Sequence, residues 1–341
     1  MYVSKIKYIN RAAQQFSRKP AIALLLIIYI LCFPCASQAQ KTVVFIPKAT
    51  ILHYWKIVCT GAHAAIQNTD VNLIWRGSRV EEKLDAQKHL LEFYTDKKVD
   101  AIILAPADKE RLNPYIEKAV ETGIKVVIID SPVTTKAPHA YIATGNYESG
   151  QSGAELLIKD VSKKGPLLLI GHRPDNGASY LREQGFIDRI NELSPGRSII
   201  RLHMTGGSER ETRITVGEIL DSIPGIAGIF SVNEPTSDGV LHVLNNHPDK
   251  DIPFVAFDYN QHLLQGIKEG KVNALITQKP YAMGFFGVRA ALDLLDGKKI
   301  PKIMYSPVTI ITPKNVEVSM NLKCLRKIKQ SEKEHCAICF N

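Results

Sequence analysis

Short apolar segments alternate with longer segments of helical character along most of the chain from Thr42 onward. The short segments are rich in Val, Ile and Leu, and the longer ones repeat apolar residues every three or four positions. This alternation is typical of parallel βαβ units, in which a helix joins each strand to the next. We therefore predict an α/β fold with two doubly wound parallel-sheet lobes.

The apolar pattern also sets the expected bounds of each element. A second series of strands and helices starts near residue 149, so two similar halves are predicted. The predicted strands are 42–46, 71–75, 100–104, 125–129, 141–143, 166–170, 198–202, 226–230, 254–257, 272–277 and 305–311. The predicted helices are 55–68, 81–95, 114–122, 149–161, 179–193, 212–222, 237–245, 262–269 and 281–295.

The first 39 residues have the pattern of a signal peptide. Five basic residues and no acidic residue precede the apolar run 21–33. A signal-peptide core needs only about 7–15 apolar residues, whereas a transmembrane helix needs about 20. Ser37-Gln38-Ala39 is the small-x-small order that a signal peptidase reads, so we expect cleavage after Ala39 and a periplasmic mature chain. An uncleaved N-terminal anchor is the alternative.

The formal charge of +9 is concentrated at the two ends of the chain. Cleavage removes the five positive charges of the leader, and the tail from Asn321 onward carries a further net charge of +3. The predicted folded body is therefore nearly neutral. It lacks the basic stripe that nucleic-acid binding requires, so no nucleic-acid partner is expected.

Cys59 and three cysteines of the tail remain after the predicted cleavage. In the tail, Cys336 and Cys339 form a single CxxC pair beside His335, and Cys324 lies upstream. Such a set is compatible with zinc binding or redox exchange. An oxidising compartment favours a disulfide, or an appendage without a role. We predict no metal site and no cofactor.

Polar and aromatic side chains gather directly after the predicted strands in both halves. Open parallel sheets bind ligands beyond the carboxyl ends of their strands. Carboxylates accept hydrogen bonds from hydroxyl groups, arginine and amides donate them, and aromatic rings cover the apolar face of a sugar. We therefore predict a site for a polyhydroxylated ligand. Its residues are Lys48, Tyr54, Trp55, Asp130, Arg182, Asn233, Asp258 and Gln278.

Each of these residues also has a purely structural alternative. An aspartate after a strand often caps the next helix, which applies to both aspartates of the set. The two aromatic residues can be core residues at the start of a helix. Arg182 can pair with Glu183 or Glu211 on a solvated face.

The sequence contains no G-x-S-x-G, H-E-x-x-H or G-x-x-x-x-G-K-[ST] motif. The histidines His172, His203 and His242 are scattered along the sequence, and none is predicted to act as a base. We therefore predict that the protein is not an enzyme. An enzyme on the same scaffold is kept as an alternative because a fold does not fix a function.

In their order and spacing, several segments resemble the ribose-binding protein family, the type I periplasmic sugar-binding proteins that share a fold with the ligand domains of LacI-type repressors. The resemblance extends from about Thr42 to Pro313. It rests on Tyr54-Trp55, Gly61-Ala62, residues 99–108, Ile129-Asp130, residues 144–146, residues 182–186, residues 229–234, residues 256–258 and residues 277–280.

The resemblance implies two lobes joined by a three-strand hinge. The N-terminal lobe would comprise residues 41–144 plus 279–308, and the C-terminal lobe residues 145–278 plus 309–320, before a basic, cysteine-containing tail at 321–341. It also implies roles for the site residues. Tyr54 and Trp55 would stack on the ligand, and the residues that hydrogen-bond it would be Asp130, Arg182, Asn233, Asp258 and Gln278.

The chain departs from the ribose binders at several positions. Lys48 replaces a serine, Leu52-His53 an Asn-Pro pair, Ser131 an arginine and Gly145 an aspartate, and Ser208 lies near an expected phenylalanine. Smaller side chains enlarge the pocket and Lys48 adds a cation. We therefore expect a ligand larger than a pentose, or one with an anionic group. Lys48 can instead neutralise one of the two aspartates.

We predict a periplasmic solute-binding protein that closes two lobes on a small polar ligand, a sugar or sugar derivative, and delivers it to the permease of an ABC importer. The alternative is a periplasmic sensor whose closed form is read by a histidine kinase or chemoreceptor. A cytoplasmic repressor is disfavoured, because a leader and no helix-turn-helix precede Thr42.

Overall fold

The computed structural model describes residues 40–79, 83–204 and 208–317. The predicted leader, its cleavage site and the tail lie outside these residues. Every helix that the structure describes is too short or too polar to span a membrane.

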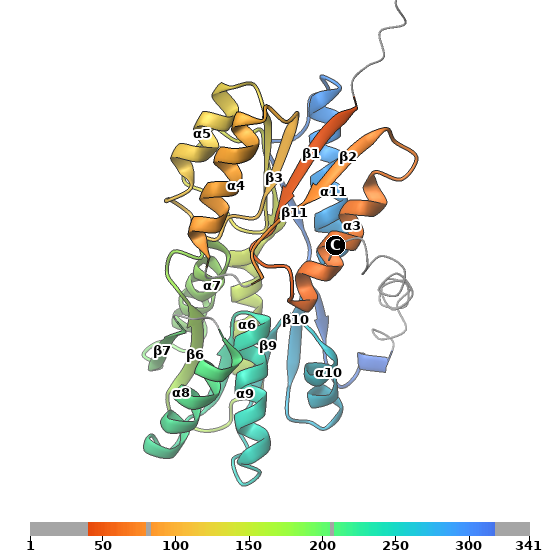
Figure 1. Cartoon of the computed structure of the whole chain (residues 1–341). Coiled ribbons are helices and arrows are strands. Elements are labelled where there is room, and N and C mark those ends of the chain that lie inside the picture. The colour runs from red at the N-terminus through yellow and green to blue at the C-terminus, as the bar shows by residue number, and fades with distance from the viewer. Residues whose placement is uncertain (1–39, 80–82, 205–207, 318–341) are drawn as a thin grey trace, which may run out of the picture. The chain divides into compact units, whose positions relative to one another are not determined.

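Two six-stranded sheets, each with its own helices, make up residues 41–317 (Figure 1). The strands of the first sheet are β1 (Lys41–Ile46), β2 (Val71–Trp75), β3 (Ala101–Leu104), β4 (Lys125–Ile129), β5 (Ala140–Thr144) and β11 (Ile303–Ser306). Its helices are α3 (His53–Ala65), α4 (Leu84–Asp96), α5 (Asn113–Glu121) and α11 (Pro280–Leu295).

The second sheet repeats this arrangement. Its strands are β6 (Leu167–His172), β7 (Ile199–Met204), β8 (Gly228–Ser231), β9 (Phe254–Phe257), β10 (Ala274–Thr277) and β12 (Thr309–Ile311). Its helices are α6 (Asn146–Asp160), α7 (Gly177–Leu193), α8 (Glu209–Ser222), α9 (Glu234–Asn246) and α10 (Gln261–Lys268).

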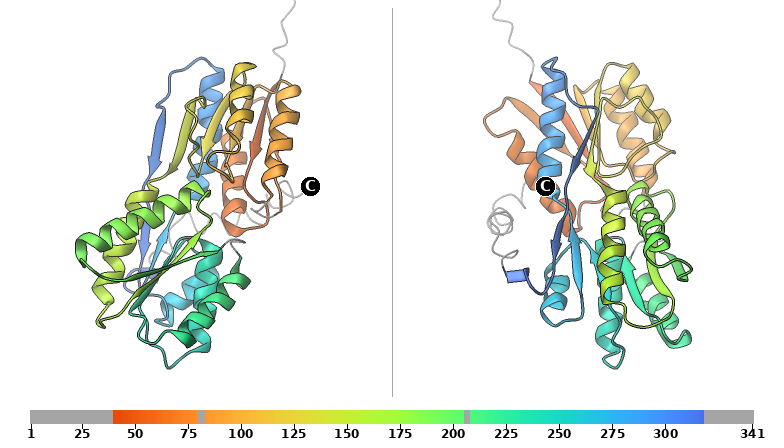
Figure 2. Two further views of the ribbon diagram at one scale, coloured as in Figure 1. Left: turned by 90° about the vertical axis from the view of Figure 1, so that its left-hand side faces the viewer. Right: turned by 180° about the vertical axis from the view of Figure 1, so that it is seen from behind.

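Both sheets have the same strand order. The order is β2-β1-β3-β4-β5-β11 in the first sheet and β7-β6-β8-β9-β10-β12 in the second. All pairs are parallel except β10 with β12, which are antiparallel. The chain passes between the sheets three times, after β5, after β10 and after β11 (Figure 2). The predicted class, two doubly wound α/β lobes with a three-strand hinge, is confirmed.

The strands are almost entirely apolar because helices cover both faces of each sheet. In β1, Val43 and Phe45 pack in one core cluster and Val44 and Ile46 in another, as the two-residue period of a strand requires. All four side chains are fully buried. Each lobe therefore has two apolar layers, one on each side of its sheet.

Several element bounds differ from the sequence expectations, and two of the differences have a clear physical reason. The predicted strand 305–311 is interrupted at Pro307 and Val308, where the chain crosses from the first sheet to the second. Proline has no N–H group to continue a ladder. Helix α9 begins at Glu234, three residues before the predicted start, because the side chain of Asn233 accepts a hydrogen bond from Thr236 N at 3.1 Å.

Glycines allow the helices of the first lobe to pack in close contact. A Cβ atom on Gly61 of α3 would lie 2.0 Å from the carbonyl oxygen of Tyr281, and one on Gly284 of α11 would lie 1.9 Å from that of Val58. No neighbouring side chain can move to relieve such a clash, because the contacts are with backbone atoms. The α3–α11 pair thus depends on having no side chain at these positions.

Helices α6 and α7 of the second lobe also pack closely at glycines. A Cβ atom on Gly150 would lie 2.0 Å from the carbonyl oxygen of Arg182, and one on Gly185 would lie 2.0 Å from that of Tyr147. This contact fixes the position of α7 at Arg182, the arginine predicted to bind the ligand.

Cys59 on α3 is fully buried and disulfide-bonded. Within the described residues, no cluster of three or more His, Cys, Asp or Glu side chains is arranged to hold a metal ion.

The glycine contacts give a stability prediction. Gly284→Ala should lower the free energy of unfolding by about 2–3 kcal/mol through overpacking. Gly217→Ala is the matched control, because no atom lies within 4 Å of the added Cβ on α8. It should raise the free energy of unfolding by about 0.5–1 kcal/mol through helix propensity. Urea unfolding measures both, and equal effects would contradict the close α3–α11 contact.

Candidate functional site

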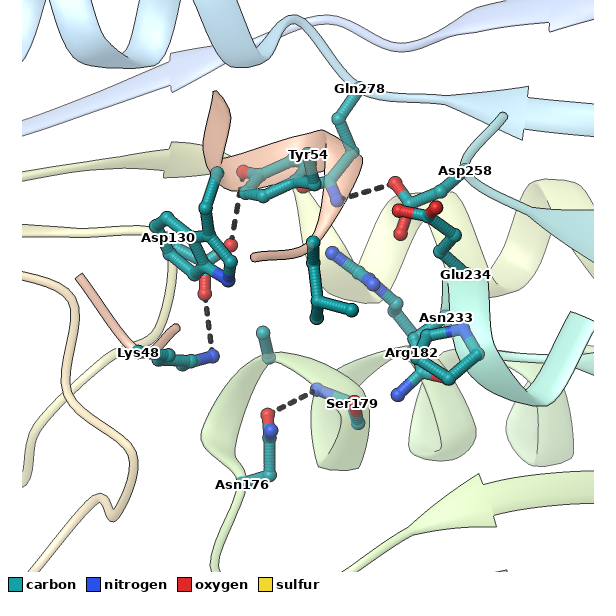
Figure 3. A pocket seen from close by; sticks show the side chains of 14 residues that line it. Lys48, Tyr54, Asp130, Asn176, Ser179, Arg182, Asn233, Glu234, Asp258 and Gln278 are labelled. Atoms are coloured by element: carbon teal, nitrogen blue, oxygen red, sulfur yellow. Dashed lines mark hydrogen bonds and ion pairs between the residues drawn. The ribbon is translucent and has the colours of Figure 1, made fainter. Parts of the chain in front are cut away.

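A pocket with an empty volume of about 430 Å³ lies at the carboxyl ends of strands from both sheets (Figure 3). All eight residues that the sequence predicted for the site line it. The full lining is Lys48, Leu52, Tyr54, Trp55, Asp130, Asn176, Ala178, Ser179, Arg182, Asn233, Glu234, Pro235, Asp258 and Gln278.

Two aspartates occupy equivalent positions in the two sheets. Asp130 follows β4 and Asp258 follows β9, and their φ angles of 65° and 66° lie in the left-handed region. Such a conformation costs roughly 1–3 kcal/mol for a residue other than glycine, although aspartate tolerates it better than most. Asp130 N still donates to Ile142 O at 3.0 Å, and Asp258 N to Ile276 O at 2.8 Å. The strained turn therefore keeps the sheet hydrogen bond, and both aspartates line the pocket.

The alternative that these aspartates cap helices is wrong. Asp130 is followed by the loop to β5, not by a helix. After Asp258, α10 is capped by Asn260, whose side chain accepts from Leu263 N at 2.9 Å.

Asp130 forms a buried ion pair with Lys48. Lys48 Nζ donates to Asp130 Oδ2 and to Ser131 Oγ, each at 2.5 Å, and Tyr54 Oη donates to Asp130 Oδ1 at 3.1 Å. Burial raises the pKa of Asp130, but the charges of Lys48 and Arg182 outweigh this and hold the pKa below its ordinary value. Lys48 thus neutralises Asp130, the second of the two roles considered from the sequence.

Arg182 on α7 is 3% exposed and held from several sides. Its Nε donates to Asn146 Oδ1 and its Nη1 to Val232 O, both at 2.8 Å. The guanidinium carbon lies 3.8 Å from the ring centroid of Phe257, a cation–π contact. These contacts hold the guanidinium in the pocket rather than on the surface.

Glu183 does not pair with Arg182. Its Oε2 accepts from Arg201 at 2.6 Å, and its Oε1 accepts from His172 N at 3.1 Å. The alternative in which Arg182 pairs with Glu183 on a solvated face is therefore wrong.

The second lobe adds acceptors and amides. Gln278 Nε2 donates to Asp258 Oδ1 at 2.7 Å, and Gln278 Oε1 accepts from Thr144 Oγ1 at 2.8 Å. Burial raises the pKa of Asp258, against the lowering effects of Arg182 and Gln278. The side-chain oxygen of Asn233 caps α9, which leaves its NH₂ group as the donor on the pocket wall.

Tyr54 and Trp55 belong to the core and to the pocket at once. They are 9% and 1% exposed, pack in the apolar cluster between the first sheet and its helices, and also line the pocket. Their rings meet edge to face, with centroids 5.0 Å apart. The core description is confirmed, and stacking of these rings on a ligand stays a prediction.

Glu234 was not among the predicted site residues, although it lines the pocket as the first residue of α9. Burial and then the charge of Asp258 raise its pKa to about 8. The signal in the sequence was its place directly after Asn233 at a strand end. A residue directly before a proline is common in the first turn of a helix. The sequence alone therefore did not indicate that the side chain of Glu234 faces the pocket. The other lining residues that were missed are Leu52 before α3, Asn176, Ala178 and Ser179 at the start of α7, and Pro235 in the first turn of α9.

The two halves also touch directly. Arg111 Nη2 pairs with Asp175 Oδ2 at 2.8 Å, and Lys109 N donates to Asp175 O at 3.1 Å. Elsewhere, the rings of His53 and Tyr259 meet edge to face at 5.8 Å. These contacts join residues of the first lobe to residues of the second.

The raised pKa of Glu234 predicts a pH-dependent stability. Protonated Glu234 contributes stability that is fully present below about pH 4.5 and is lost as the pH rises through about 8. Glu234→Gln should therefore raise the free energy of unfolding of the unliganded protein at pH 9 by roughly 3–5 kcal/mol more than at pH 4, at about 1.4 kcal/mol per pKa unit. Glu117→Gln, at an exposed position of α5, is the control. Denaturant unfolding at both pH values measures the difference, and a pH-independent effect would contradict the burial of this carboxyl group.

Comparisons with known proteins agree with this geometry. Residues 43–299 match the family described as periplasmic binding protein domain. The ribose import binding protein of Bacillus subtilis is 28% identical over 217 residues, which cover 63% of this chain and 70% of that protein. An ABC transporter solute binding protein from Agrobacterium vitis with bound D-fucose has a TM-score of 0.78 at 30% identity, covering 81% of this chain and 97% of that one.

A periplasmic component of an ABC-type sugar transport system from Hahella chejuensis has a TM-score of 0.76 at 29% identity, covering 79% of this chain and 99% of that one. The resemblance to the ribose-binding proteins that the sequence showed is confirmed. The chain belongs to the periplasmic binding protein family.

Proposed function

We propose that the protein captures a sugar or sugar derivative between its two lobes and presents it to an ABC importer. The observation that carries this proposal is the pair of aspartates, Asp130 and Asp258, on equivalent strand ends of the two sheets around one pocket. Carboxylates in such positions accept hydrogen bonds from neighbouring hydroxyl groups of a polyol.

The other lining residues support the same ligand class. Arg182 and Asn233 offer donors beside the aspartates, and the aromatic pair of α3 offers an apolar surface for the C–H face of a sugar ring. The proposed role is binding without catalysis, because Asp130 is already tied to Lys48 and Asp258 to Gln278.

Lobe closure would couple binding to transport. A ligand stabilises the closed arrangement only as far as it contacts both lobes, and here the lining comes from both. Micromolar affinity, about −8 kcal/mol, would suit the capture of a scarce solute. The relatives described above are named for import or for ABC transport, which favours an importer over a sensor kinase or chemoreceptor as the partner.

The proposed location is the periplasm. The basic and apolar pattern of residues 1–39 supports export with cleavage after Ala39, and a permease in the inner membrane would be the partner that reads the closed form.

Asp258→Asn tests the function. Neutral pentoses and hexoses, tested one at a time by calorimetric titration, should include a ligand of the wild-type protein. The substitution should weaken that ligand about 10- to 150-fold, because a hydrogen bond to a charged acceptor contributes about 1.5–3 kcal/mol. Asp188→Asn is the control, since Asp188 accepts from Tyr147 Oη on the surface. An unchanged affinity in Asp258→Asn would place the ligand elsewhere.

A further inference from the structure

The carboxyl group of Glu234 lacks a charge partner. Glu234 is 9% exposed, and its Oε2 is buried with no hydrogen-bond partner among the described residues. Its Oε1 accepts a long hydrogen bond, 3.4 Å, from Asn260 Nδ2. Figure 3 shows this carboxyl group beside that of Asp258 on the wall of the pocket.

The acidic side chains that line the pocket outnumber the cationic ones. Two cationic side chains, Lys48 and Arg182, face three acidic ones, Asp130, Glu234 and Asp258. Lys48 pairs with Asp130, and the charge of Arg182 acts on Asp130 and Asp258. With Glu234 ionised, the lining carries one negative charge in excess.

The groups around Glu234 do not supply the missing cation. After β9, Asp258 adds a second negative charge, and on α9 itself Asp238 adds another, which is paired with His262 of α10 at 3.0 Å. The backbone N–H of Tyr54 at the start of α3 lowers the pKa of Glu234, yet it forms no hydrogen bond of normal geometry with Oε2. A buried carboxylate in such surroundings is costly unless a positive group joins it.

We propose that the ligand is an amine-bearing sugar or polyol, whose ammonium group pairs with Glu234 while its hydroxyl groups contact Asp130, Asp258 and Arg182. This inference rests on the proposed function and narrows it. A single positive charge on the ligand balances the single excess negative charge of the lining. An amine-bearing ligand differs from the anionic ligand group that Lys48 suggested in the sequence. Because Lys48 forms an ion pair with Asp130, its charge is already balanced within the protein.

Pairing with an ammonium group has a measurable consequence for protons. With a pKa of about 8, the Glu234 carboxyl group is protonated in most unliganded molecules at pH 7. A bound ammonium group stabilises the ionised form of the Glu234 carboxyl group, so the carboxyl proton is released to the buffer. A neutral sugar leaves the proton in place. Binding of the amine should therefore release about one proton per ligand at pH 7.

Matched pairs of ligands test the proposal. The probes are D-glucosamine with D-glucose, D-galactosamine with D-galactose, and D-glucamine with D-sorbitol, titrated calorimetrically into the mature chain in two buffers of different ionisation enthalpy. We expect the amine of at least one pair to bind about tenfold tighter than its neutral partner or better, with release of about one proton.

Glu234→Gln should abolish both the preference for the amine and the proton release. Glu209→Gln is the matched control, because Glu209 is the first residue of α8 as Glu234 is of α9, but is exposed. This control should keep both the preference and the proton release.

The outcomes separate this inference from the proposed function. Binding of the neutral members with no preference for the amines, or a preference that persists in Glu234→Gln, overturns the inference and leaves sugar binding intact. If none of the paired ligands and none of the neutral pentoses and hexoses binds, the proposed function is wrong, and this inference is wrong with it.

Discussion

A charged side chain that is removed from water needs opposite charges or hydrogen bonds around it, and this constraint governs the centre of the molecule. Lys48, Asp130, Arg182 and Asp258 are each at least about nine-tenths buried. Each has its direct partner in its own lobe, and the charge of Arg182 also acts on Asp130 across the pocket. Lys48 and Asp130 belong to the first lobe, whereas Arg182 and Asp258 belong to the second. The electrostatics of the pocket therefore depend on the two lobes meeting.

The two lobes place these charged side chains through the same arrangement of strands and helices. Each sheet has the same strand order, and in each an aspartate in the left-handed conformation follows the equivalent strand. In each lobe, a pair of helices packs backbone against backbone through glycines, and one such pair holds the helix of Arg182. Since the chain crosses between the sheets three times, short connections determine how the two sets of strand ends face each other. Ligand contact with both sets then favours closure.

The sequence predicted those parts of the structure that depend on periodicity. Fully buried strands and amphipathic helices leave a strong apolar pattern, and their alternation fixed the class of fold. The rule that ligands bind beyond strand ends then led to all eight predicted lining residues. The helix starts were less accurate, because Asn233 and similar caps act through one local hydrogen bond that no apolar pattern records.

Other parts of the site depend on contacts between distant segments. The Lys48–Asp130 pair joins residues 82 positions apart, so the sequence could only offer it as one of two roles. Glu234 was overlooked because an acidic residue before a proline is common in the first turn of a helix. Only the packing of α9 against the neighbouring strand ends shows that its carboxyl group lines the pocket.

The most direct test of the central claim is amide hydrogen exchange of the mature chain with and without a bound sugar. A sugar held between the lobes should protect strand-end segments of both lobes at once, around Asp130 in the first and around Asn233 and Asp258 in the second. Protection confined to one lobe, or located away from these strand ends, would contradict a ligand held between two closing lobes.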